Sequence, residues 1–496
     1  MKKVLLLTNA DYDNVGDQMI EACDRALLQA AFENLGVLDE TEIISRGVSL
    51  ISTDYVKQQD ARLLKAAEQA VKESDLLLFG GAPVFNYRYE SFYEKTATWL
   101  SLAQKYDKPV IFSAIGVEHV EENNPKCQRI KQALHDANVV MVTTRDGLSQ
   151  LEWYVEGLDL IAEKVADPAV YTKEIFTPYL AKEKEEKSVG IFILRANGFL
   201  DNGHDFTRDD AARLWLDVME KCRENGYTPY LLTSGFAADE AFLDYMIRHY
   251  HVPKENCIFN VNTPEDLVYQ ISRMEAVISC RLHPGILSYS LGVPAVGIQW
   301  NPKVKMFYHE IGYEDRAIPM EGIDSALLWE RLQEAMGDVA ERDETRAWHT
   351  YETLEEGIRK ALYPKNREAV WSREEFLERI RPYPGTTKED YEKKLEAKFR
   401  RAYVTYNNAF QKGQKLQKQL DETKEKAKSS HEHALALKEK NLRLQEKVTR
   451  LNARNVELKG KLKDARCELN EVYSQSLIET VRNWRKGKKE HEKQDS

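Results

Sequence analysis

Short apolar runs that alternate with longer amphipathic stretches constrain the fold of this chain more than any other feature of its sequence. In the first part, the apolar runs are Val4–Thr8, Asp75–Phe79, Val110–Ile115 and Val139–Thr143. Helical patterns such as 17–35, 60–74, 92–106 and 125–137 separate them. Continuous apolar strands separated by helices are typical of a parallel sheet covered by helices on both faces.

The same alternation resumes after a change of composition. Residues 179–188 (YLAKEKEEKS) are polar and highly charged, which predicts a linker between an N-terminal domain over 1–178 and a C-terminal domain over 189–363. The second set of strand-like runs is Val189–Leu194, Pro229–Thr233, Ala276–Cys280 and Pro294–Gln299. We therefore expect an α/β fold with two Rossmann-like, doubly wound domains, whose ligands bind at the carboxyl ends of the strands.

Composition narrows the functional classes. The chain has 496 residues, more than one hydrophobic core usually serves, and a net charge of −10, which gives the body no electrostatic reason to bind nucleic acid. The six cysteines form no CxxC pair, which indicates reduced thiols in a cytosol and neither a disulfide framework nor a zinc site. The N-terminal run VLLL is too short for a signal peptide. We expect a cytoplasmic protein without a metal centre.

Two motifs in the first domain stand where strands end. Asn14-Val15-Gly16-Asp17 follows the first strand and opens the first helix, where Gly16 permits a tight turn, Asp17 could cap the helix and free amides can hold an anion. Gly80-Gly81 ends the strand DLLLF and lets a ligand or another backbone come close. An ordinary capped turn and a plain tight turn are the alternatives. Arg145 follows a further strand and adds a permanent cation.

Cations also follow the strands of the second domain. Arg195 ends one strand, and Ser279-Cys280-Arg281-Leu282-His283 follows another, so that a fixed charge lies two residues from a group that can exchange protons near pH 7. Lys303 follows the next strand. Because all of these residues are predicted at strand ends, we expect them in one cleft that binds a small, highly anionic substrate, with phosphate the simplest choice.

The order of these motifs resembles the polysaccharide pyruvyl transferase family. The resemblance covers roughly residues 3–315, with Ala82 and Cys280 as departures from the family pattern. The matching pieces are N-x-G-D at 14–17, Gly80-Gly81, A-I-G at 114–116, Arg145-Asp146, Asp167-Pro168, S-x-R-L-H at 279–283, G-V-P at 292–294 and N-P-K at 301–303. The resemblance implies a GT-B-like arrangement of the two domains and phosphoenolpyruvate as donor, with no cofactor.

The resemblance also implies the roles of the site residues. The donor side would comprise Arg195, Arg281, Leu282, His283 and Lys303. The acceptor side of the cleft would comprise Asn14, Gly16, Asp17, Gly80, Gly81 and Arg145. The product would be a pyruvate ketal across two hydroxyls of a sugar in a surface glycan or its precursor, which is lipid-linked in one alternative. Enolpyruvate chemistry needs an acid to protonate carbon 3, here His283, and fixed cations to stabilise the departing phosphate, here Arg195 and Arg281.

Two other functions fit the same sequence. A nucleotide-sugar-dependent glycosyltransferase of the same architecture would use an acidic residue late in the second domain, for which Glu310 is the candidate. A non-enzymatic scaffold would act through the tail alone, although the intact Arg195, Arg281, His283 and Lys303 argue against it. Phosphate release from phosphoenolpyruvate with candidate acceptors, against nucleotide-sugar turnover, separates these functions.

The rest of the chain predicts a long helical tail. After a proline-containing connector at 364–388, residues 389–472 read as helix, with Leu437, Leu444, Leu451 and Leu458 at seven-residue spacing. With these at position d, Asn441 and Asn455 occupy position a, a pattern that fixes register in a two-stranded coiled coil. Basic residues flank the seam (Lys440, Lys447, Arg454, Lys459, Lys461 and Arg466), so an acidic partner helix, or a staggered or antiparallel pairing, fits better than a parallel homodimer. A long solvated helix without a partner is the competing interpretation, since only about four heptads are clear.

The last segment, 473–496, combines apolar and basic residues. Leu477, Ile478, Val481 and Trp484 accompany Arg482, Arg485, Lys486, Lys488 and Lys489. Such an amphipathic end can rest on an anionic membrane surface, at the inner face of the cell membrane, and a disordered basic terminus is the alternative.

Overall fold

The first domain is built on a six-stranded parallel sheet. The computed structural model describes residues 1–10, 14–88, 91–118 and 120–491. The strands of the first sheet, in spatial order, are β2 (Thr41–Gly47), β1 (Lys2–Thr8), β3 (Leu76–Gly80), β5 (Val110–Ile115), β7 (Val139–Thr144) and β8 (Ile161–Lys164). Every neighbouring pair is parallel. The order reverses between β1 and β3, which creates a crevice at their carboxyl ends. A short parallel pair, β4 (Phe85–Asn86) and β6 (Val117–Glu118), adjoins this edge.

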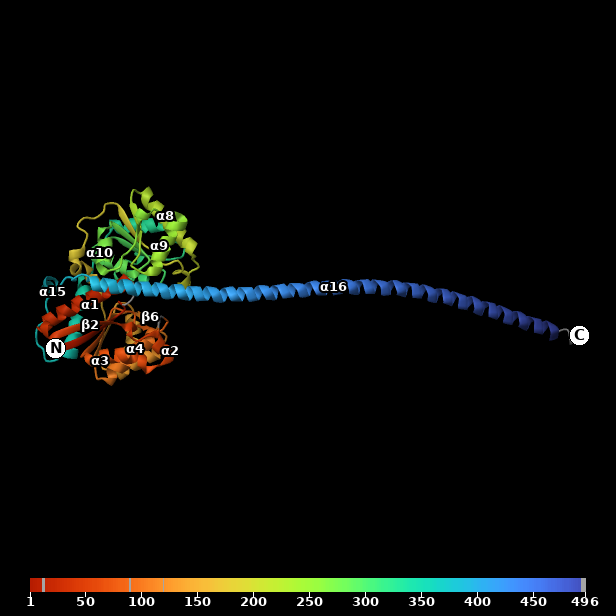
Figure 1. Cartoon of the computed structure of the whole chain (residues 1–496), viewed down its shortest axis with the longest axis horizontal. Coiled ribbons are helices and arrows are strands. Elements are labelled where there is room, and N and C mark those ends of the chain that lie inside the picture. Colours follow the sequence, from red (N-terminus) through yellow and green to blue (C-terminus); the bar gives the residue numbers. More distant parts are fainter. Residues whose placement is uncertain (11–13, 89–90, 119, 492–496) are drawn as a thin grey trace. The chain divides into compact units, whose positions relative to one another are not determined.

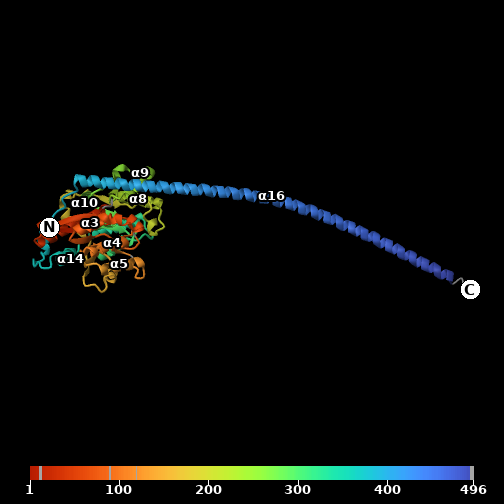
Figure 2. The same cartoon turned by 60° about the horizontal axis from the view of Figure 1, so that its bottom comes forward.

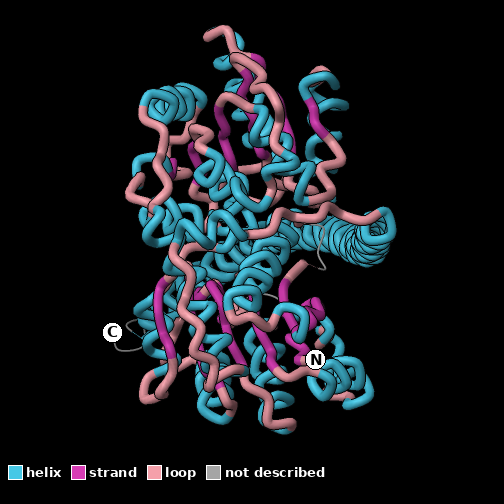
Figure 3. The backbone as a smooth tube through the Cα atoms, turned by 90° about the vertical axis from the view of Figure 1, so that its left-hand side faces the viewer, coloured by secondary structure: helices cyan, strands magenta, loops and turns pink. Residues whose placement is uncertain are grey.

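A second six-stranded parallel sheet forms the second domain (Figures 1 and 3). Its spatial order is β11 (Cys257–Ile258), β10 (Thr228–Leu232), β9 (Ser188–Phe192), β12 (Ala276–Ser279), β13 (Ala295–Ile298) and β14 (Ala317–Ile318). Here the order reverses between β9 and β12. The two parallel sheets confirm the expected α/β fold, and the linker at 179–188 leads directly into β9.

Helices cover both faces of each sheet, because alternate side chains of every strand point to opposite sides. In β1, Val4 and Leu6 join one core and Leu5 and Leu7 join another. The helices of the first domain are α1 (Val15–Asn34), α2 (Thr53–Gln58), α3 (Lys65–Glu73), α4 (Phe92–Lys105), α5 (Pro125–Asp136), α6 (Leu148–Val155) and α7 (Thr172–Ile175). Those of the second domain are α8 (Arg208–Glu224), α9 (Ala237–Tyr250), α10 (Pro264–Arg273), α11 (Leu282–Leu291), α12 (Pro302–Glu310) and α13 (Ser325–Gly337).

One apolar core runs through both domains. It joins Phe32 of α1 to Ile271 of α10 and Ile286 of α11, and all three side chains are buried. Helix α14 (Glu344–Leu362) follows the second domain in sequence but packs on the first sheet, where Gly357 lies against Met141 of β7. The expected second domain, which ends at residue 363, includes α14, whereas this helix packs on the sheet of the first domain. The shared core fixes the strand ends of the two sheets relative to each other.

The segment 364–388 packs on the body, although we expected a connector. Phe376 of α15 (Arg373–Arg379) is fully buried, and its ring centroid lies 4.2 Å from that of Tyr351 in α14. Arg381 forms an ion pair of 2.8 Å with Glu33 of α1. The first turns of α16 (Lys388–His491) also belong to this compact unit, which extends to Tyr403. A single buried aromatic ring in a polar stretch gives no periodic signal, which explains the difference.

The second unit, 404–496, consists of the remainder of α16. Figure 2 shows α16 as one uninterrupted ribbon, and every side chain from 404 to 486 is exposed. The predicted helix is therefore present, and it continues as helical backbone to His491, while 492–496 lie outside the described residues, as do the side chains of Lys488 and Lys489. Pairing of the helix in a coiled coil stays a prediction. None of the described helices combines the length and hydropathy needed to cross a membrane.

Candidate active site

The sequence motifs lie at the points where the strand order of each sheet reverses. In the first sheet, Asn14–Asp17 follows β1 and Gly80-Gly81 ends β3. In the second sheet, Arg195 follows β9 and Arg281 follows β12. Crevices at such reversals are the usual ligand sites of open α/β sheets. Most of the predicted donor and acceptor residues therefore belong to the two reversal points, whereas Arg145 follows β7 and Lys303 follows β13, away from the reversals.

A direct contact joins the two reversal points. Asn14 caps α1 by accepting a hydrogen bond of 3.2 Å from the amide of Gly16, and the amide of Val15 donates to the carbonyl of Ser234, after β10, at 2.9 Å. A Cβ added at Gly16 would lie 2.1 Å from Nδ1 of His283. Glycine is therefore required at this position because the imidazole of the second domain packs directly on the backbone of the first.

His283 is buried at the start of α11, and its Nε2 has no hydrogen-bond partner among the described residues. Burial lowers the pKa of His283, Asp167 opposes this effect and the charges of Arg145, Lys303 and Arg281 add to it, so that the net value is about 4. The imidazole is therefore neutral at pH 7 and can accept a proton there. The expectation of an acid with a pKa near neutrality is not met at this residue in the ligand-free protein, because burial outweighs the nearby carboxylate.

Asp17 is the group whose pKa approaches neutrality. Its Oδ2 accepts hydrogen bonds from the side-chain amides of Asn9 (3.1 Å) and Asn14 (3.3 Å), and the residue is only 9% exposed. Burial raises the pKa of Asp17 to about 6, against the lowering effect of Lys303 and Arg145. The helix cap is Asn14, so Asp17, which we considered as the cap, is free for another role. A first-turn aspartate behind an N-cap asparagine was the only signal for it in the sequence.

Each of the four predicted cations has a carboxylate partner. Arg145 and Asp167 form a buried ion pair, and Lys303 pairs with Glu118 at 2.7 Å. Arg195 and Arg281 pair with Asp201 and Asp239, respectively. Sequence reasoning missed three of these carboxylates because they come from other elements, and it noted Asp167 only as part of a motif. The crevice is therefore balanced in charge, and an anionic ligand has to compete with these carboxylates.

Asp239 of α9 holds the second reversal point together. It is fully buried, and its carboxylate accepts two hydrogen bonds from Arg281, from Nη2 at 2.7 Å and from Nε at 2.9 Å. The same carboxylate accepts a hydrogen bond of 2.7 Å from the backbone amide of Arg195. The guanidinium of Arg281 also lies over the rings of Phe236 and Trp300. Arg281 is thus fixed in orientation, whereas the side chain of Arg195 is 31% exposed and pairs with an exposed carboxylate.

The glycines at the end of β3 serve helix packing. A Cβ at Gly80 would lie 2.0 Å from Oδ2 of Asp24 in α1, and one at Gly81, whose φ is +48°, would lie 2.2 Å from Ile20. Burial raises the pKa of Asp24 well above its usual range. The space beside the two glycines is filled by α1, and their role as acceptor contacts stays a prediction. Ala82, the departure from the family pattern, is buried.

A small cavity of about 50 Å³ lies between the two domains. Leu282, Ile286 and Phe307 form part of its apolar wall, and Arg145 and Lys303 lie at its polar side. Glu310 also lines it, but this carboxylate forms ion pairs with Lys164 of β8 and, at 3.1 Å, with Arg346. Of the predicted donor residues, Leu282 and Lys303 thus border one enclosed space.

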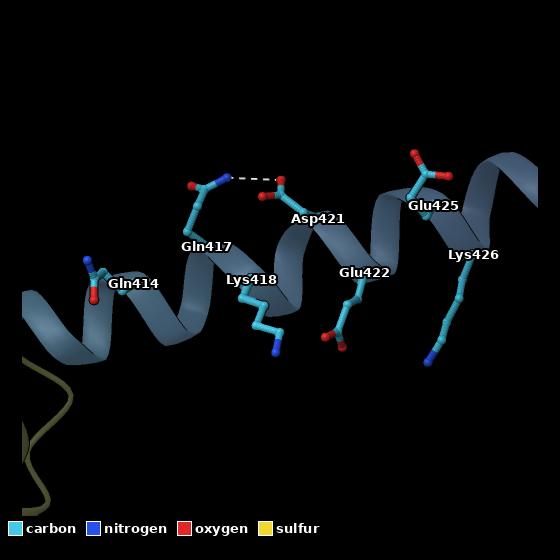
Figure 4. A pocket seen from close by; sticks show the side chains of 7 residues that line it. All are labelled: Gln414, Gln417, Lys418, Asp421, Glu422, Glu425 and Lys426. Carbon is cyan, nitrogen blue, oxygen red and sulfur yellow. Dashed lines mark hydrogen bonds between the residues drawn. The ribbon is translucent and has the colours of Figure 1, made fainter.

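Neither a metal centre nor a second ligand site is formed by the other features of the described residues. Within the described part of the chain, no group of three or more His, Cys, Asp or Glu residues is arranged to hold a metal ion. A shallow hollow on α16 is lined by side chains of one exposed helix that project to two sides of it, with a hydrogen bond of 3.0 Å from Gln417 to Asp421 (Figure 4). A single helix face cannot enclose a substrate.

Comparison with known proteins places the chain in a family. No curated protein matches the sequence. Solved structures that resemble it include a putative UDP-N-acetylglucosamine 2-epimerase from Listeria monocytogenes, with 12% identity and a TM-score of 0.47 over 75% of this chain and 100% of that one. Another is the E. coli heptosyltransferase WaaC with ADP, with 11% identity and a TM-score of 0.38 over 67% of this chain and 99% of that one. The sequence model of the polysaccharide pyruvyl transferase family matches residues 14–302, which is more than half of the chain. That match starts at Asn14 and ends just before Lys303, and so includes both reversal points; the chain belongs to the polysaccharide pyruvyl transferase family.

Proposed function

We propose that the protein transfers the three carbons of phosphoenolpyruvate to two hydroxyls of a sugar in a cell-surface polysaccharide or its precursor. The product is a pyruvate ketal, phosphate is released, and the reaction takes place in the cytoplasm. The observation that carries this proposal is the packing of His283 on Gly16, which brings two proton-exchanging side chains and several cations to one crevice in a member of this family.

The proton balance of the reaction defines what the site must do. Two sugar hydroxyls lose their protons, one proton goes to carbon 3 of the donor to make a methyl group, and the other leaves with phosphate. The pKa values of Asp17 and His283 are shifted in opposite directions by burial, to about 6 and about 4. These shifts reverse the ordinary order of the two groups, so that the pKa of the carboxyl lies above that of the imidazole, which favours the carboxyl as the proton donor of the pair. We assign the acid that protonates carbon 3 to Asp17 and the base that accepts a hydroxyl proton to His283.

The cations would bind the phosphate and carboxylate of the donor. The bidentate carboxylate of Asp239 fixes the guanidinium of Arg281, so this residue offers a preorganised charge. Arg195 pairs at 2.6 Å with Asp201, whose side chain is 52% exposed, so this pair exchanges for a ligand more easily than a buried pair does. Lys303 at the start of α12 would add a third cation. A bound trianion would also raise the pKa of His283 from its low value.

A donor assay tests the proposal. Purified full-length protein is incubated with phosphoenolpyruvate and candidate glycan acceptors, and phosphate release is measured together with the mass of the acceptor. We expect phosphate release that depends on the acceptor and an acceptor that gains a ketal-linked pyruvate. Turnover of a nucleotide sugar, with no reaction of phosphoenolpyruvate, would refute the proposal in favour of a glycosyltransferase. The engagement of Glu310 by Lys164 and Arg346 argues against that alternative.

A further inference from the structure

The exposed part of α16 carries an apolar seam that no described residue covers. Leu437, Leu444, Leu451 and Leu458 are 49–56% exposed and occupy position d of a heptad repeat. Position a holds Ala434, Asn441, Val448, Asn455, Leu462 and Leu469. The register extends upstream to Leu416 at d and Leu420 at a. Apolar residues at a and d form the narrow seam of a two-stranded coiled coil, and Leu435, Leu442 and Val456 at position b are exposed apolar residues outside it.

Charges are sorted strictly around this seam. Between 412 and 468, position g holds Lys412, Lys426, Lys440, Lys447, Arg454 and Lys461, and its acidic residue is Glu468. Position e holds Lys424, Lys438, Lys459 and Arg466 and no acidic residue. The acidic residues of the same stretch are otherwise at the outer positions, for example Glu425, Glu432, Glu439 and Glu446 at f and Glu457 and Asp464 at c. Both borders of the seam are therefore basic, whereas its back carries charges of both signs.

This sorting disfavours a second copy of the chain as the partner. In a parallel pair, position g of one helix faces position e of the next heptad in the other, which sets Arg454 against Lys459 and Lys461 against Arg466. In an antiparallel pair, g faces g and e faces e, so the basic columns oppose each other along most of their length. Like charges at these positions destabilise the pair. Glu457 at position c pairs with Lys461 at 2.6 Å and offsets part of its charge, whereas Arg443–Glu439 (2.7 Å) lies on the back face and involves no border residue.

An anionic membrane fits the basic borders but not the seam itself. Helices that lie on membranes are rich in Trp, Phe and Leu on the apolar face, whereas 411–472 contains no aromatic residue. Asn441 and Asn455 stand in the centre of the seam, where lipid would leave their amides without partners. In a coiled coil, asparagines at position a pair with each other and fix the register.

We propose that residues 434–472 form one strand of a parallel, two-stranded coiled coil with a different protein. The partner strand is a helix with leucine at d, asparagine opposite Asn441 and Asn455, and glutamate or aspartate at both e and g. Opposite charges across the two borders then replace the repulsion that a second copy would create. This inference does not depend on the proposed reaction, because the seam lies outside the unit that carries the crevice.

A designed peptide tests the inference on the full-length chain. The probe spans the length of 434–472, with leucine at d, valine at a except for asparagine opposite Asn441 and Asn455, and glutamate at every e and g. The control probe has lysine at every e and g. Binding is followed by fluorescence anisotropy and by sedimentation. We expect a one-to-one complex with the acidic probe, no binding of the basic probe, and at least tenfold weaker binding when ionic strength rises from about 0.1 M to 1 M, where the screening length falls to about 3 Å.

Matched variants define the outcomes that overturn the inference. Leu444→Asp with Leu451→Asp should abolish binding of the probe, whereas Arg443→Asp with Arg450→Asp, both at position c, should not. A full-length chain that sediments as a dimer without any probe, and loses that dimer in the leucine variant, would show that a second copy covers the seam. Flotation with phosphatidylserine vesicles that is lost in the leucine variant, together with no binding of the acidic probe, would assign the seam to lipid. Either result refutes the proposal.

Discussion

The contact between Gly16 and His283 predicts the effect of one added methyl group. In Gly16→Ala, the new Cβ would lie 2.1 Å from Nδ1 of the imidazole, whereas real Cβ contacts essentially never fall under 3.0 Å. The ring therefore has to move by about 1 Å or more, and a displacement of this size in a catalytic group lowers turnover by about 10²-fold. Overpacking of a buried site should also lower the free energy of unfolding by about 1–3 kcal/mol.

The assay combines phosphate release from phosphoenolpyruvate with thermal unfolding, so that a loss of activity is separated from a loss of fold. Gly337→Ala is the matched control, because a Cβ there meets no atom within 4 Å, and it should change neither turnover nor stability appreciably. The double variant Gly16→Ala, His283→Ala should be less destabilised than the two single effects predict together, since removing the ring removes the clash. Wild-type turnover and melting temperature in Gly16→Ala would refute the geometry described here.

Three further predictions follow from the charges and the packing. In Asp17→Asn, the free energy of unfolding should rise by about 3 kcal/mol as pH rises from 4 to 6.5, because the pKa of His283 is about 4 in the folded chain and 6.5 in the unfolded one. In the wild type, Asp17 opposes this rise, because its folded pKa of about 6 lies above the unfolded value of 3.8. Urea unfolding at several pH values checks this, and a flat profile in the variant would contradict it. Arg281→Ala should weaken phosphoenolpyruvate binding measured by calorimetry, and Arg281→Lys should restore it only in part because a point charge lacks the fork; equal affinities would place the anion elsewhere. A chain that ends at Tyr403 should keep the melting temperature of the body, whereas one that ends at Pro364 should melt lower by several degrees, since it loses α15; identical melting curves would show that α15 contributes nothing.

Much of the fold was predictable because parallel sheets leave a local signature. A strand buried on both faces must be a continuous apolar run, so Leu76–Gly80 and Ala276–Ser279 stand out without any knowledge of their neighbours. Parallel strands also bring their carboxyl ends to one edge. For this reason Gly16 and His283, which are far apart in sequence, could both be placed at the crevice.

The partners of the site residues could not be predicted in the same way. Asp239 meets Arg281 only because α9 crosses the end of β12, and a first-turn aspartate looks the same in sequence when it merely faces solvent. The pKa of His283 depends on burial by the opposite domain, which no local pattern encodes. Gly80 illustrates the opposite case. Its glycine motif was evident in the sequence, but the side chain that occupies the space beside it belongs to Asp24 of α1, which the motif does not indicate.

The first turns of α16 act on both domains at once. Lys394 donates a hydrogen bond of 2.6 Å to Gln18 of α1, and one turn later Lys398 forms an ion pair of 2.8 Å with Glu240 of α9 and a hydrogen bond of 2.8 Å to Asn262. The start of α16 therefore links the first domain to the second beside the crevice. A hinge motion that opened the domains would have to break these contacts and split the shared apolar core.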